Sequence, residues 1–230
     1  MPRLLRLLTV ALFCLLLAAC GEDDEGGAAP SAATPTPTPA AGAAADPECK
    51  KVSEPKARPE GELKAPRTKL DKAKTYTATV ATSCGEFKIE LDVERAPKTS
   101  ASFANLAEKK FFDGTIFHRI VPGFVIQGGD PTGTGMGGPG YSVEEAPPSD
   151  LAYTKGVVAM AKTGAEAPGT SGSQFYVVTG EDVGLPAEYA LLGKVTEGQE
   201  VVDLIGASPT GPDERPTNPV VIEKVTVAEG

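Results

Sequence analysis

Eight short apolar segments constrain the fold of this chain most strongly. The first two, residues 75–83 and 85–92, alternate apolar and polar side chains and are rich in β-branched residues, which is typical of paired strands. Six more such segments follow, and glycine- or proline-containing turns separate several of them. They are residues 115–120, 124–128, 156–161, 174–178, 190–195 and 218–229. Strands of this number and length favour a closed barrel.

Two further segments have the periodicity of helices. Residues 96–110 carry Pro97 near their start and place Phe103 and Leu106 on one face. Residues 198–206 place their aliphatic side chains inward in the same way. We therefore predict a mainly β fold for residues 75–230, a closed eight-stranded barrel capped by two α-helices.

The first 19 residues read as a signal peptide. Two arginines precede an apolar run over residues 7–19, which is short for a membrane span of about 20 residues. The run ends in "LAAC", which resembles the lipobox of bacterial lipoproteins and makes Cys20 the predicted lipidation site. The alternative is an ordinary signal peptide cut after Ala19. We expect an exported protein that is anchored to the cell membrane through lipid, with its domain outside the cytoplasm.

The segment after Cys20 cannot fold alone. Residues 21–47 contain no aliphatic or aromatic side chain larger than Ala or Pro, so they cannot bury enough apolar surface. We interpret residues 20–47 as a lipid-anchored, disordered tether rich in Pro, Ala and Thr. Residues 48–74 are polar and basic with three prolines, and we expect them to form an extension packed on the domain.

Two cysteines, Cys49 and Cys84, belong to the exported part of the chain and are not expected to carry lipid. A pair of cysteines in an oxidising compartment favours a disulfide. The alternative is two free thiols.

Composition excludes several classes of function. The chain has 31 acidic and 22 basic residues, so it should repel nucleic acid. Its only histidine, His118, and its scattered carboxylates do not form a metal-ligand cluster. The "GTGMGG" stretch at 133–138 matches a dinucleotide-binding pattern, but no helix follows it. We expect neither a metal nor a cofactor.

Three longer stretches identify the family. "FHRIVPGFVIQGGD" (117–130), "GSQFYVV" (172–178) and "LLGKV" (191–195) closely resemble motifs of cyclophilin-type peptidyl-prolyl cis/trans isomerases. The resemblance spans about 75–227 and keeps the family order. It implies an isomerase that binds proline-containing polypeptide segments and needs no cofactor.

The resemblance also assigns residues. It implies that Arg119 and Gln127 are catalytic, and it places a set of substrate-binding side chains around them. This set consists of Phe124, Val125, Met160, Ala161, Gln174, Tyr176, Leu185 and Tyr189. Strand alternation adds Phe117, which should share the face of Arg119. Tyr176, Tyr189 and Gly184 replace a phenylalanine, a histidine and a tryptophan of the family.

Prolyl isomerisation offers a reason for the charged Arg119 in an otherwise apolar run. We expect Arg119 to stabilise the twisted X-Pro amide of exported proteins, in a monomeric enzyme. The alternative is a binding module or chaperone on the same scaffold, which holds proline segments with little turnover.

Overall fold

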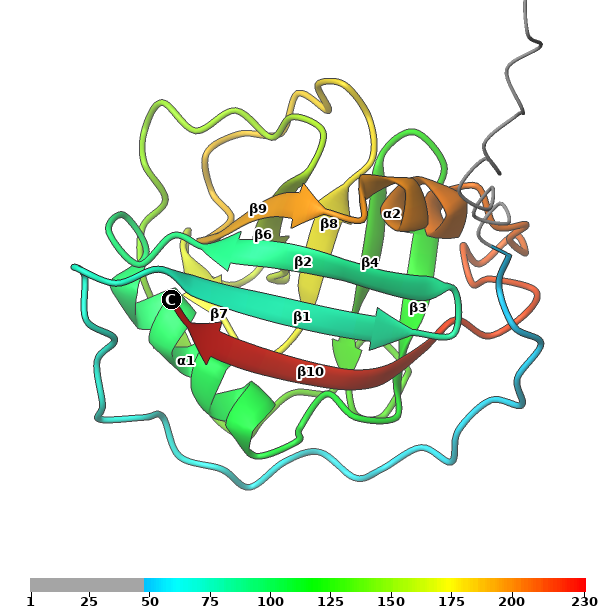
Figure 1. Ribbon diagram of the computed structural model, residues 1–230, viewed down its shortest axis with the longest axis horizontal. Coiled ribbons are helices and arrows are strands. Elements are labelled where there is room, and N and C mark those ends of the chain that lie inside the picture. Colours follow the sequence, from blue (N-terminus) through cyan, green and yellow to red (C-terminus); the bar gives the residue numbers. More distant parts are fainter. Residues whose placement is uncertain (1–47) are drawn as a thin grey trace, which may run out of the picture. The chain divides into compact units, whose positions relative to one another are not determined.

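The computed structural model describes residues 48–230, so the predicted signal peptide, lipidation site and tether (residues 1–47) lie outside it. Eight strands form a closed barrel in the order β1-β10-β3-β4-β8-β6-β9-β2 (Figure 1). Their bounds are Tyr76–Thr82 (β1), Gly85–Leu91 (β2), Thr115–Val121 (β3), Val125–Asp130 (β4), Val157–Met160 (β6), Phe175–Val178 (β8), Leu191–Glu197 (β9) and Val221–Glu229 (β10). The predicted barrel is confirmed.

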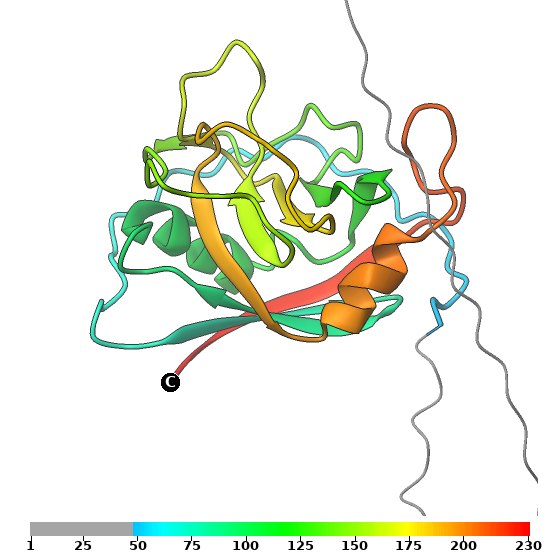
Figure 2. The same cartoon turned by 90° about the horizontal axis from the view of Figure 1, so that it is seen from above.

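Two helices cover opposite ends of the barrel (Figures 1 and 2). Helix α1, Pro97–Glu108, begins with a proline, which is favourable because the first helical N–H has no partner within a helix. Helix α2, Gln199–Gly206, buries its aliphatic face over β2, β3 and β4. Both helices lie where the sequence periodicity predicts them.

Aromatic side chains fill the barrel end under α1. The rings of Phe103 and Phe112 stack with centroids 4.7 Å apart, and Phe175 meets both edge-on. All three are fully buried, and truncating one such core phenylalanine to alanine costs about 3–5 kcal/mol. This cluster joins α1 to β8, the strand that carries part of the candidate site on its other face.

A small second sheet was not predicted. Strand β5, Val143–Glu144, pairs with β7, Thr170–Ser171. Strands of two residues are too short to show a hydrophobic period, so only the folded chain reveals them.

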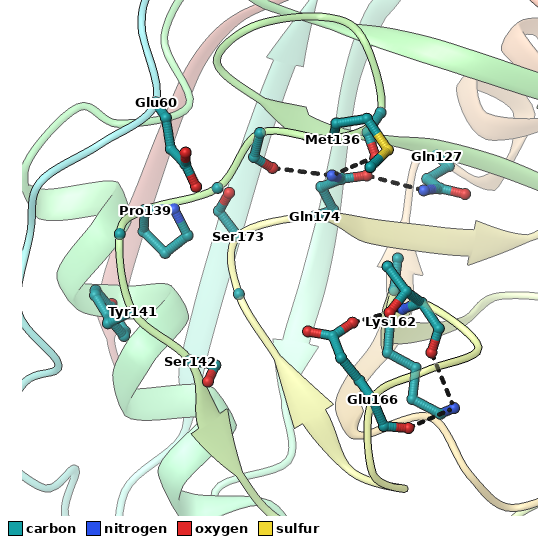
Figure 3. A pocket seen from close by; sticks show the side chains of 17 residues that line it. Glu60, Gln127, Met136, Pro139, Tyr141, Ser142, Lys162, Glu166, Ser173 and Gln174 are labelled. Carbon is teal, nitrogen blue, oxygen red and sulfur yellow. Dashed lines mark hydrogen bonds between the residues drawn. The ribbon is translucent and has the colours of Figure 1, made fainter.

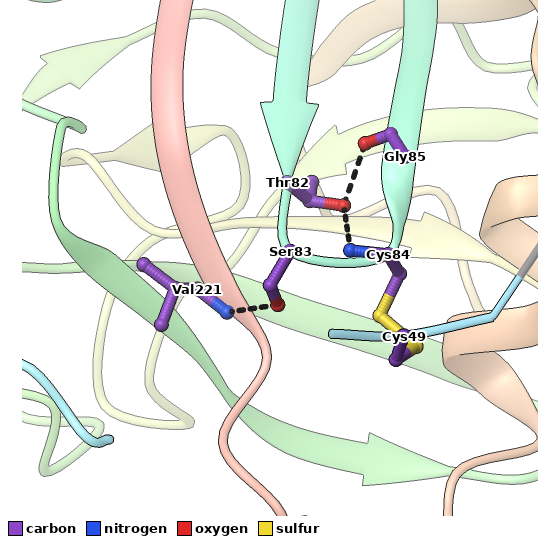
Figure 4. Close-up of a disulfide and its surroundings, with 6 residues drawn as sticks. All are labelled: Cys49, Thr82, Ser83, Cys84, Gly85 and Val221. Atoms are coloured by element: carbon purple, nitrogen blue, oxygen red, sulfur yellow. Dashed lines mark hydrogen bonds between the residues drawn. A yellow bond between two sulfur atoms is a disulfide. The ribbon is translucent and has the colours of Figure 1, made fainter. Parts of the chain in front are cut away.

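The turn between β1 and β2 carries Cys84 and is fixed by its own side chains. The hydroxyl of Thr82 donates to the carbonyl of Gly85 at 2.7 Å and accepts from the Cys84 N–H at 3.0 Å (Figure 4). Gly85 has a φ of 124°, which glycine adopts without steric cost. The predicted disulfide between Cys49 and Cys84 is present.

Residues 48–74, which we call the strap, run as an extended segment around the outside of the barrel (Figure 1). Main-chain N–H groups of Lys50, Arg58, Gly61 and Leu63 donate to the barrel's turns and loops at 2.8–2.9 Å. The side chains of Leu63 and Leu70 pack against the core. Within residues 48–230, no helix has the length and hydrophobicity needed to cross a membrane.

The disulfide should contribute a measurable part of the stability. It joins cysteines 35 residues apart, and closing a loop of that length is worth about 3–4 kcal/mol in the chain-entropy model. We expect the Cys49→Ala/Cys84→Ala double variant to lose about this free energy of unfolding in urea.

Reduction of the wild-type protein serves as the control and should lower its stability to a similar value. Thiol labelling of the unfolded, unreduced protein should detect neither Cys49 nor Cys84. Labelling of both cysteines would show that they do not pair.

Candidate active site

Arg119 lies on the outer face of the barrel, opposite Gln127 across the pairing of β3 with β4. Its Nη1 is 3.5 Å from Oε1 of Gln127, whose Nε2 donates to Oε1 of Gln174 at 3.0 Å. The Nε2 of Gln174 in turn donates to the carbonyls of Gly135 and Gly137 at 3.0 and 2.9 Å (Figure 3). One hydrogen-bonded chain therefore connects the guanidinium to the glycine-rich loop.

That loop, residues 131–138, folds around the buried carboxylate of Asp130. The carboxylate accepts bonds from the N–H groups of Thr132, Thr134, Gly135 and Gly137. Burial alone would raise the pKa of Asp130, but the donors of Thr132, Gly137 and Gly135 outweigh it and hold the pKa below its usual value. Any side chain at Gly137 would collide with Asp130. The glycines of this motif therefore wrap a carboxylate of the protein itself.

An apolar surface lies beside Arg119. Six of the predicted substrate-binding residues belong to one cluster on this side of the barrel wall: Phe124, Val125, Ala161, Tyr176, Leu185 and Tyr189. The guanidinium carbon of Arg119 is 5.9 Å from the centre of the Phe124 ring. The Tyr176 and Tyr189 rings meet edge-on at 5.7 Å. The structure thus combines an apolar surface with a guanidinium beside Phe124, while the ammonium of Lys162 lies 5.5 Å from the centre of the Tyr189 ring at another part of the border.

Two predicted residues point elsewhere. Phe117 is fully buried and meets the ring of Phe175 inside the barrel. The pairing register shifts between Phe117 and Arg119, which face Gly128 and Gln127 respectively, so His118 has no partner in β4. This bulge breaks the alternation on which the placement of Phe117 depended. The expectation that Phe117 shares the face of Arg119 is therefore wrong.

Met160 is likewise 1% exposed and belongs to the interior cluster. Its neighbours Ala159 and Ala161 contribute to the outer surface instead. Alternation along β6 explains the difference, because successive side chains point to opposite faces. A contact between the Met160 side chain and substrate is not supported by this position.

His118 is buried, and neither ring nitrogen has a hydrogen-bond partner among residues 48–230. Burial lowers the pKa of His118 to about 4. The imidazole is therefore neutral at pH 7, and its position under the glycine-rich loop fits a packing role.

No sequence pattern predicted the ion-pair partner of Arg119. The Nε of Arg119 donates to Oε2 of Glu214 at 2.5 Å, although the two residues are 95 positions apart. Glu214 lies in the loop between α2 and β10. No local pattern links that loop to β3, so only the tertiary structure identifies this residue.

A groove of about 410 Å³ lies beside Gln127 and Gln174 (Figure 3). The glycine-rich loop and Met136 form one side, and Ala161, Lys162 and Glu166 lie across it. Glu60 of the strap also lines it. A polypeptide bound at Arg119 has room to continue along this groove.

Comparisons with known proteins agree with this geometry. Residues 77–227 match the family model described as "Cyclophilin type peptidyl-prolyl cis-trans isomerase/CLD". The chain is 42% identical over 172 residues to peptidyl-prolyl cis-trans isomerase A of Mycobacterium tuberculosis, covering 67% of this chain and 93% of the relative. It is 40% identical over 174 residues to isomerase B of Streptomyces anulatus, covering 67% and 98%.

A solved structure supports the same conclusion. The crystal structure of a cyclophilin-type isomerase from Cryptosporidium parvum superposes with a TM-score of 0.63 at 33% identity, covering 68% of this chain and 99% of that one. The chain therefore belongs to the cyclophilin-type peptidyl-prolyl cis-trans isomerase family.

Proposed function

We propose that this isomerase accelerates X-Pro rotation by donating a hydrogen bond from Arg119 to the twisted amide. Rotation breaks no σ bond but must overcome the amide resonance, with a barrier of about 18–20 kcal/mol. In the planar ground state the prolyl nitrogen shares its lone pair with the carbonyl. In the twisted state the lone pair is localised and accepts a hydrogen bond, so the bond forms only where it lowers the barrier.

The position of Arg119 at the border of the apolar cluster carries this proposal. Phe124 and the neighbouring apolar side chains offer a surface for the proline ring, while the guanidinium 5.9 Å from the Phe124 ring supplies the donor. A hydrogen bond to a charged group is worth about 1.5–3 kcal/mol. That energy corresponds to about one to two powers of ten in rate.

Gln127 acts as a positioning residue in this scheme. Its amide oxygen faces Arg119, and its amide nitrogen is held by Gln174. Because Gln174 is fixed by two loop carbonyls, the orientation of Gln127 is set before substrate binds.

The proposed clients are proline-containing segments of exported proteins. The signal-peptide pattern, the lipobox-like "LAAC" ending at Cys20 and the tether composition support an enzyme held near the membrane by lipid. The Cys49–Cys84 disulfide supports an oxidising compartment. Met136 is the only large hydrophobic side chain exposed within residues 48–230, which supports a monomer.

Arg119→Ala should reduce kcat/KM by about ten- to a hundredfold, because the hydrogen bond to the twisted amide is lost. Arg119→Lys should also be poor, since an ammonium lacks the fixed donor fork. Exchange NMR measures the rate of cis/trans exchange in a proline peptide. Both variants are tested as full-length chains kept in solution with detergent.

Arg95→Ala is the matched control, because Arg95 pairs with Asp92 and lies outside the apolar cluster. It should keep full activity. Undiminished turnover in Arg119→Ala would remove the arginine mechanism. Peptide binding by the wild-type protein without turnover would favour a binding module.

Cys20→Ser should abolish lipid attachment, because a hydroxyl cannot replace the thiol that carries the lipid. Metabolic labelling with a radioactive fatty acid in the producing bacterium measures this attachment. Cys14→Ser is the control and should be labelled like the wild type. Normal labelling of the Cys20→Ser protein would rule out this anchor.

A further inference from the structure

Glu214 has an unusual backbone conformation. Its φ is 62°, and Lys110 is the only other non-glycine residue with positive φ within residues 48–230. This left-handed region is disfavoured for residues that have a Cβ. Such outliers persist only where the surroundings enforce them, and they concentrate at functional sites. The conformation of Glu214 therefore calls for a physical explanation.

The surroundings hold Glu214 from several sides. Its carbonyl accepts from the Ile120 N–H at 2.8 Å, directly beside Arg119 on β3, and its own N–H donates to Gly211 at 3.0 Å. The next residue, Arg215, donates from Nη1 to the Gly133 carbonyl at 2.6 Å and from Nη2 to Glu54 of the strap at 2.9 Å. The loop is thus joined to β3, to the glycine-rich loop and to the strap.

This frame places a carboxylate on one particular atom of Arg119. Oε2 of Glu214 accepts from Nε at 2.5 Å. Nη1 is directed toward Gln127, and Nη2 has no hydrogen-bond partner among residues 48–230. The carboxylate therefore occupies the edge that Nε shares with one hydrogen of Nη2, and the other hydrogen of Nη2 is left for a ligand.

We propose that Glu214 is a positioning residue that orients Arg119 for catalysis. This inference rests on the proposed role of Arg119. An arginine side chain has many rotamers, and fixing it before substrate arrives lowers the entropy lost on reaching the transition state. The contact between Arg119 and Gln127, at 3.5 Å, is at the limit of a hydrogen bond. Glu214 consequently supplies the stronger constraint.

An opposite role for the same contact makes a different prediction. A carboxylate that competes with substrate for the guanidinium would inhibit the enzyme, so its removal would increase activity. The Nε position argues against competition, because the carboxylate leaves available the hydrogen of Nη2 that points away from the Nε edge. Kinetics of one substitution separate the two roles.

Glu214→Gln keeps the size and hydrogen-bonding capacity of the side chain but removes its charge. We expect kcat/KM to fall about three- to tenfold, mainly through kcat, since ion pairs of side chains that are partly exposed are of moderate strength. Glu54→Gln is the matched control, because it removes a carboxylate charge near the same loop while its amide oxygen still accepts from Arg215, and Arg119 keeps its own partner Glu214. It should keep wild-type activity.

A spectroscopic measurement tests orientation without turnover. The ¹H–¹⁵N signal of the Arg119 Nε group, assigned by its absence in Arg119→Ala, should be shifted and protected from solvent exchange in the full-length protein. Glu214→Gln should reduce this protection, because a neutral amide oxygen accepts a weaker hydrogen bond than a carboxylate, and Glu54→Gln should not reduce it. In an Arg119→Lys background, Glu214→Gln should cause no further loss of activity, because a positioning residue acts only through its partner.

Three results would overturn the proposal: unchanged kcat/KM and Nε protection in Glu214→Gln, increased activity in that variant, or equal losses in Glu214→Gln and Glu54→Gln. The positioning role of Glu214 and the catalytic role of Arg119 can fail separately. If Arg119→Ala is inactive while Glu214→Gln is fully active, only the positioning role fails. If Arg119→Ala is fully active, the arginine mechanism itself fails.

Discussion

The register between β3 and β4 decides on which face of the barrel Arg119, the proposed catalytic residue, lies. A bulge at His118 directs Phe117 into the barrel and Arg119 out of it, opposite Gln127. Without the bulge, simple alternation would place Phe117 on the same side as Arg119. Because His118 is unpaired, Phe117 can pack against the aromatic core while Arg119 lies on the outer wall of the barrel.

Supports from distant parts of the chain then fix the polar groups of the site. Asp130 shapes the glycine-rich loop, whose carbonyls hold Gln174, and Gln174 holds Gln127. The loop before β10 brings Glu214 to the other edge of Arg119. The strap bonds to both loops and is joined to the barrel by a disulfide. The site is thus built on a barrel wall with several independent attachments.

Prolyl isomerisation suits such a scaffold because the reaction makes modest chemical demands. The proposed mechanism requires only an apolar surface for the proline ring and a donor that becomes useful when the amide twists. Both are surface properties of adjacent strands, and in this protein they meet where Arg119 borders the cluster around Phe124. Orientation of the donor is then the quantity that the surrounding residues can adjust.

The sequence by itself determined the barrel strands and both helices, because their hydrophobic periods are long enough to read. It also predicted the Cys49–Cys84 disulfide, since only these two cysteines were assigned to the exported domain without lipid. The family motifs predicted Arg119, Gln127, Phe124 and Tyr176 as site residues, because these lie within the two longest contiguous runs that resemble the family, 117–130 and 172–178.

Only the tertiary structure decided the positions that depend on long-range contacts or local irregularities. Glu214 meets Arg119 across 95 residues, and no periodicity encodes such a pairing. Phe117 was misplaced because a one-residue bulge reverses the face of every residue beyond it. The two-residue strands β5 and β7 are stabilised by their mutual pairing and their packing, so they have no signature in the sequence.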